Sequence, residues 1–111
     1  MATSMPPYEQ EPLACRIQDP AQLRQRQTEV TTLFKGATST QELTDGYALS
    51  FPSEAGWATK LLEFILFENE CCPFYTFELI FEHQHGPLWL RWRGPEGTKD
   101  VLKSSFAELF A

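Results

Sequence analysis

Two stretches near the C-terminus, in which apolar and polar residues alternate, most restrict what this chain can fold into. Between residues 75 and 83 aromatic and aliphatic side chains fall on every second residue, and the same period recurs in Leu88–Arg93. This period is typical of a strand with one buried face. The intervening His85-Gly86-Pro87 marks a turn. The two stretches therefore predict a hairpin, with Glu78 and Glu82 facing arginines across its solvent side.

The rest of the chain carries helix and strand signals in turn. The predicted elements are a strand at Leu13–Ile17, a helix from Asp19 to Lys35, strands at Ala37–Leu43 and Tyr47–Phe51, a helix from Pro52 to Cys71, and a last helix after Gly97 with Leu102, Phe106 and Leu109 on its core face. Thr44-Asp45-Gly46 is interpreted as a three-residue loop that sets Leu43 opposite Tyr47. Because residues 61–67 are apolar almost all round, we expect their helix to be the most buried one.

The predicted order is βαββαββα, and its first six elements match the split βαβ pattern of a ferredoxin-like fold. We therefore expect an α+β two-layer sandwich, ferredoxin-like with an added strand and helix. Residues 1–12, which hold three prolines and no apolar run, are expected to be a flexible N-terminal tail. Residues 13–111 are expected to form a single α+β domain.

Composition narrows the possible partners and the cellular compartment. With a net charge of -6, the 111-residue chain lacks the basic character of a nucleic-acid binder, so neither nucleic acid nor an anionic membrane is an expected partner. The longest apolar stretch, Phe64–Phe67, is far too short to span a bilayer, and Met1–Pro12 does not resemble a secretory signal. Three cysteines, an odd number, favour reduced thiols and a cytoplasmic location over a disulfide framework.

Cys71 and Cys72 are the strongest candidates for a functional site. Pro73 disfavours helical geometry at the residue before it, so the pair should lie at the exposed end of a helix, with Glu68 one turn upstream. The neighbouring carboxylates and the negative end of the helix disfavour a thiolate, which argues against nucleophilic catalysis, and we do not expect an enzyme. A soft metal ion such as Cu(I), Hg(II) or Zn(II) reverses this argument because it deprotonates the thiols on binding. Cys15, as a third thiol, or Glu68, as a carboxylate ligand, would complete the metal site with Cys71 and Cys72.

Other interpretations remain open from the sequence alone. The cysteines could be small buried side chains in a structural or protein-interaction module, or they could belong to a thiol redox protein. A vicinal disulfide would be strained. Trp89 and Trp92 fall on opposite strand faces, and the exposed one, with Phe74 or Tyr75, could bind a protein partner or form a homodimer.

A second possible ligand pair lies further along the chain. His83 and His85 would share a strand face if the strand continued, which is compatible with a metal site. The pair lies at the far end of the strand that begins after Cys72, so it is interpreted as a solvated turn.

The spacing Glu68-x-x-Cys71-Cys72-Pro73-Phe74-x-x-Phe77-x-Leu79, followed by Gly86-Pro87-x-Trp89-Leu90 and Gly94-Pro95-x-Gly97, resembles a family of small, largely uncharacterised bacterial proteins. The resemblance covers roughly the second half of the chain, with a weaker echo at Leu13-Ala14-Cys15. Such proteins are associated with metal-responsive or mercury-related genes. The resemblance implies that Cys15, Cys71 and Cys72 are recurrent thiol positions and identifies neither a ligand nor a catalytic residue.

Overall fold

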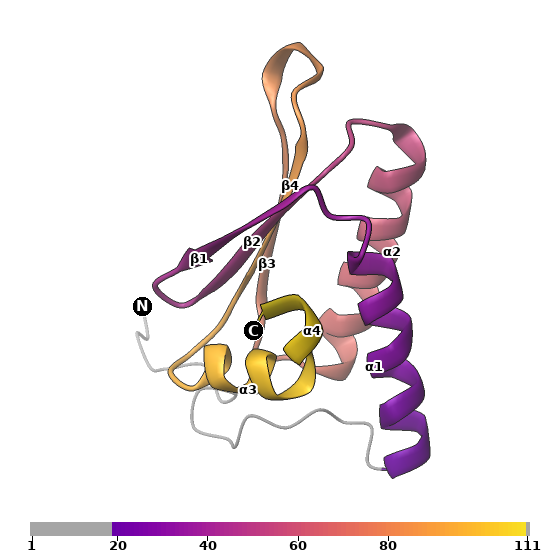
Figure 1. Cartoon of the computed structure of the whole chain (residues 1–111), viewed down its shortest axis with the longest axis vertical. Helices are drawn as coiled ribbons and strands as arrows, with labels where there is room; N and C mark the ends of the chain where they lie inside the picture. The colour runs from indigo at the N-terminus through magenta and orange to yellow at the C-terminus, as the bar shows by residue number, and fades with distance from the viewer. Residues whose placement is uncertain (1–18, 111) are drawn as a thin grey trace, which may run out of the picture.

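A four-stranded antiparallel sheet organises the part of the chain that the computed structural model describes, residues 19–110 (Figure 1). The elements are α1 (Pro20–Phe34), β1 (Ser39–Leu43), β2 (Gly46–Phe51), α2 (Ala55–Cys71), β3 (Thr76–Phe81), a 3₁₀ turn (His83–His85), β4 (Leu88–Arg93), α3 (Thr98–Ser105) and α4 (Ala107–Phe110). The predicted tail, residues 1–12, and the predicted strand Leu13–Ile17 lie outside the described residues.

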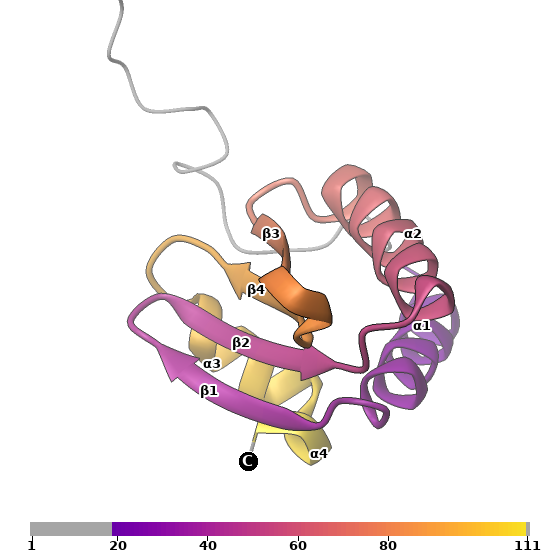
Figure 2. The same ribbon diagram turned by 90° about the horizontal axis from the view of Figure 1, so that it is seen from above.

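The strand order is β1-β2-β4-β3, and every neighbouring pair is antiparallel. The sheet and the helices that cover it confirm the predicted α+β two-layer sandwich (Figure 2). Helix α2 joins two parallel strands, β2 and β3, with antiparallel β4 between them, so the described chain contains a split βαβ unit. The strand inserted into this unit is β4.

Trp92 on β4 is the centre of the core. Its side chain is fully buried. Its ring centroid lies 5.1–6.1 Å from those of rings that lie on the four helices or at their ends, and from that of the residue just before β3. These rings belong to Phe34, Phe64, Tyr75, Phe106 and Phe110. Because α1, α2, α3 and α4 all contribute to the packing around Trp92, all four cover the same face of the sheet.

The β1–β2 hairpin differs from the prediction by one residue. Leu43 pairs with Gly46 and Glu42 pairs with Tyr47, so the loop is the two-residue Thr44-Asp45 and Leu43 lies on the outer face. A shift of one residue exchanges the two faces of a strand. A Cβ at Gly46 would lie 1.9 Å from the backbone oxygen of Trp92. Gly46 is therefore required for the close approach of β4, and its predicted left-handed turn conformation is absent.

The first helix forms as its end signals predict, and the last helix does not. The Asp19 side chain accepts a hydrogen bond from the amide of Ala21 at 3.1 Å and so caps α1. The predicted C-terminal helix is divided at Phe106, which leaves helical geometry at φ -134°. This break lets both Phe106 and Phe110 pack against Trp92, whereas Leu109 is only partly buried.

The outer face of the sheet carries the predicted cross-strand charges. Arg93 binds Glu78 at 2.5 Å and Asp45 at 3.1 Å, and Arg91 lies 3.8 Å from Glu78. The predicted strand ends at Phe81, one residue before Glu82, so only Glu78 takes part.

Helix α2 has more buried residues than any other helix within residues 19–110, as predicted, but it is not buried all round. Leu61 and Phe64 are buried, but Leu62 and Leu66 are 50% and 61% exposed. The helix packs through one face against the sheet and α1, and no other described element covers its outer face (Figure 2). None of the helices within residues 19–110 has the length and apolar character needed to cross a membrane.

Candidate functional site

Helix α2 ends at Cys71, directly before Cys72-Pro73, as the sequence predicts. Cys72 leaves helical geometry (φ -126°, ψ 77°), and its amide donates a hydrogen bond to the carbonyl of Glu68 at 2.7 Å. The amide of Tyr75 in turn donates to the carbonyl of Cys72 at 3.2 Å. This tight turn leads the chain directly from the end of α2 back into the core.

Both cysteines are buried, which corrects the expectation of an exposed helix end. Cys71 is 8% exposed and Cys72 is 3% exposed. The reason lies in the two residues after Pro73, since Phe74 and Tyr75 are also buried and pack on each other at 4.4 Å. The predicted exposed aromatic patch therefore does not include these two rings.

Glu68, one turn before Cys71, forms a buried ion pair with Arg26 of α1. The Arg26 Nε donates to Glu68 Oε2 at 3.0 Å, and the Glu68 side chain is 5% exposed. Burial raises the pKa of Glu68, and the positive charge and hydrogen bond of Arg26 offset part of this increase. The Glu68 carboxylate therefore already has a cationic partner, which offsets part of its negative charge.

The guanidinium of Arg26 is itself enclosed by α2. Its central carbon lies 4.0 Å from the ring centroid of Phe67 and 5.7 Å from that of Phe64. Its Nη2 is buried and has no hydrogen-bond partner within residues 19–110. The sequence interpretation missed Arg26, although a signal was present: this arginine shares a helical face with Val30 and Phe34, which are both buried.

Tyr75 completes the buried polar cluster, which we define as Arg26, Glu68, Cys71, Cys72 and Tyr75. Burial raises the pKa of Tyr75, and negative charge on Glu68 and on Cys71 adds to the increase. These two charges affect Tyr75 because both groups lie close to it. The Tyr75 phenol therefore remains protonated at neutral pH and can donate a hydrogen bond inside the cluster.

The cysteines of the cluster differ in their chemical state. Cys72 takes part in a disulfide in this structure, so the expectation that every cysteine is reduced does not hold at this position. Because a metal-binding sulfur must be a thiolate, Cys72 can act as a ligand only after reduction. Cys15, the predicted third thiol, lies outside the described residues.

Within residues 19–110, no group of three or more His, Cys, Asp or Glu side chains is arranged to hold a metal ion. Glu68, Cys71 and Cys72 are therefore not such a group, and the cluster offers at most its two sulfurs, because the Glu68 carboxylate already binds Arg26. This number of donors suits an ion of low coordination number better than Zn(II), which normally takes four ligands.

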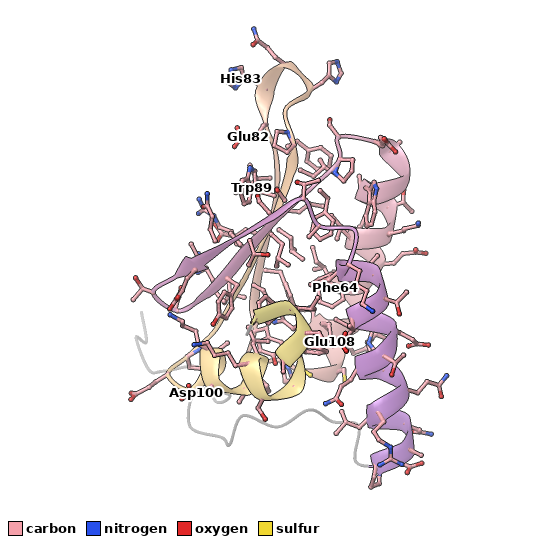
Figure 3. The ribbon with its side chains drawn as sticks, viewed as in Figure 1. Phe64, Glu82, His83, Trp89, Asp100 and Glu108 are labelled. Carbon is pink, nitrogen blue, oxygen red and sulfur yellow. The ribbon has the colours of Figure 1, made fainter. Side chains whose placement is uncertain are left out.

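His83 and His85 do not share a strand face. They flank Gln84 in a 3₁₀ turn in which Gln84 and His85 have left-handed backbone geometry, at φ 56° and 57°. The strand on which the two imidazoles would have shared a face ends at Phe81. Figure 3 shows His83 and Glu82 at the tip of the β3–β4 hairpin, which projects away from the helices. Helix α2, which ends at Cys71, leads into the opposite end of β3.

Comparisons with family models, with curated proteins and with solved structures find no match for this chain. The buried polar cluster is therefore interpreted from its own residues.

Proposed function

We propose that the reduced protein binds a soft metal ion through Cys71 and Cys72, and that it acts as a metal chaperone, buffer or sensor accessory. The observation that carries the proposal is the joint burial of two adjacent cysteines one turn from the buried carboxylate of Glu68. Soft thiolates select ions such as Cu(I) and Hg(II). Cys15 would be a third ligand from the N-terminal segment.

The electrostatics of the cluster support an incoming cation. Two buried thiolates without a counterion would be costly, because burial strongly disfavours an isolated charge. Arg26 already neutralises Glu68, so it is not available to balance the sulfurs. A bound cation would supply that balance and displace two thiol protons as the two metal–sulfur bonds form.

Native mass spectrometry of the reduced protein, titrated separately with Cu(I), Hg(II) and Zn(II), tests the proposal. We expect one tightly held ion and the release of two protons per ion, with Cu(I) or Hg(II) preferred over Zn(II). The double variant Cys71→Ser, Cys72→Ser should lose the ion and keep its circular dichroism spectrum. Retention of the ion by this variant would contradict the proposal and direct attention to His83 and His85. The single variant Cys15→Ser reports whether a third thiol contributes.

The disulfide at Cys72 favours a second candidate function, thiol–disulfide exchange. In that reaction two thiols of a small reductant are oxidised to a disulfide while the protein disulfide becomes two thiols. Equilibration in glutathione buffers, followed by mass measurement after alkylation, separates the two functions. A disulfide that remains fully oxidised or fully reduced across the physiological range of buffers would count against a redox role.

A further inference from the structure

Helix α2 presents to solvent a stripe of residues with the spacing of a coiled-coil seam. The stripe runs along positions 55, 59, 62, 66 and 69, with alternating steps of four and three residues. All five residues are exposed; Leu62 and Leu66 are its two large apolar side chains, and Ala55, Thr59 and Asn69 are small or polar. Leu62 and Leu66 are one helical turn apart and so form one continuous apolar surface, a feature that commonly marks contact with a partner.

The two flanks of this seam differ in charge. On the side of α1 lie Glu63 and Glu70, which are both exposed and form no ion pair with any other residue in the range 19–110. Phe67 lies between Glu63 and Glu70 in sequence and contacts Arg26 of α1. This contact shows that the acidic flank is the one nearer to α1. On the other side lie Ala58 and Ile65, which are partly buried against the core.

This asymmetry argues against a second copy of the chain as the occupant. In a symmetric antiparallel pair of α2 helices each flank meets its own copy, so Glu63 and Glu70 would face the same two carboxylates. In a parallel pair the acidic flank would face Ala58 and Ile65, which would desolvate the carboxylates without supplying a cation. Both arrangements are unfavourable, and the net charge of -6 adds repulsion between copies.

From the seam and its acidic flank, we propose that the outer face of α2 binds an amphipathic helix of another protein, one with an apolar stripe bordered by Lys or Arg on the side that meets Glu63 and Glu70. Apolar contact with Leu62 and Leu66 supplies affinity, and the flank charges select the partner and its orientation. The same carboxylates repel an anionic membrane surface. The proposal is independent of metal binding, since neither leucine belongs to the buried polar cluster.

Two synthetic helical peptides of about three heptads, with the same leucine seam and with either Lys or Glu at the flanking positions, test the proposal against the full chain. Fluorescence anisotropy should show saturable binding of the Lys peptide and at least about tenfold weaker binding of the Glu peptide. The double variant Leu62→Ser, Leu66→Ser should lose binding while keeping its thermal unfolding transition. The charge-reversal variant Glu63→Lys, Glu70→Lys should prefer the Glu peptide.

Several results would overturn the proposal. Equal binding of both peptides, no binding of either, or unchanged binding by the leucine variant would each exclude this surface as a selective helix site. Sedimentation equilibrium of the protein alone is expected to show a monomer. A dimer that the leucine variant abolishes would instead assign the surface to a second copy of the chain. Leucine-dependent binding to vesicles containing phosphatidylserine would assign it to a membrane.

Discussion

Arg26 and Glu68, which are 42 residues apart in sequence, form a 3.0 Å ion pair beneath the end of α2. The pair joins α1 to the turn that carries the two cysteines. The ionised form of Glu68 is tolerated in the fold because Arg26 is present, so removal of Arg26 should affect stability and its pH dependence together.

We expect Arg26→Met to lower the free energy of unfolding at neutral pH by on the order of 2 kcal/mol, because it leaves a buried carboxylate without its cation. The pKa of Glu68 is already above its ordinary value of 4.5, and loss of Arg26 raises it further. The loss of stability in the variant is therefore complete above the folded-state pKa of Glu68. It declines as the pH falls through that pKa and disappears below about pH 4.5. Urea unfolding at a series of pH values measures this.

Arg24→Met is the matched control for the ion pair. Arg24 lies on the same helix, is exposed and forms no ion pair within the described part of the chain. Its substitution should change the free energy of unfolding by less than about 0.5 kcal/mol at every pH. Identical pH profiles for the two variants would show that Arg26 does not stabilise ionised Glu68.

Phe64→Ala should lower the free energy of unfolding by about 3–5 kcal/mol, because Phe64 is 3% exposed and its ring contacts those of Phe34, Phe77 and Trp92. Leu66→Ala, two residues along α2 but 61% exposed, is the control and should change it by less than about 1 kcal/mol. Denaturant titration of both variants measures the two changes in the free energy of unfolding. Similar losses would mean that the two faces of α2 are assigned incorrectly.

Gly46→Ala and Gly56→Ala should have opposite effects on stability. A Cβ at Gly46 would overlap the backbone of β4, which cannot move without disturbing the sheet, so this variant should unfold at a markedly lower temperature. A Cβ at Gly56 meets no atom within 4 Å, and alanine should stabilise α2 by up to about 1 kcal/mol. Calorimetry of the two variants provides the comparison, and a stabilised Gly46→Ala would contradict the observed strand register.

The cysteines of the reduced, metal-free protein should react slowly with iodoacetamide at neutral pH. Cys71 and Cys72 are almost fully buried, so the reagent reaches their sulfurs only when the fold opens. Mass spectrometry over time should show slow alkylation in buffer, fast alkylation in urea, and a further decrease in rate when a soft metal is bound. Fast reaction of one cysteine in the native state would indicate an activated nucleophile and favour the redox function.

Local patterns in the sequence were sufficient to predict the helices and strands and, for most of them, which face is buried. Asp19-Pro20 specifies the start of α1, Pro73 specifies the end of α2, and the period of two places Trp89 and Trp92 on opposite faces of β4. Each of these signals acts through residues that are close in sequence, so it does not depend on how the elements are assembled. The spacing of Glu68 and Cys71 in the sequence likewise predicted that they lie on one helical turn.

The tertiary structure alone decided how distant segments meet. The insertion of β4 between β2 and β3 brings Gly46 against the backbone of Trp92. The pairing of β1 with β2 sets the register in which Leu43 faces outward. The packing of α1 on α2 brings Arg26 to Glu68, and the packing of α2 at one side of the sheet leaves Leu62 exposed. The local sequence does not show which surface covers an apolar residue or which residue pairs with a charged one. These contacts therefore depend on the assembly of the whole sheet and its helices.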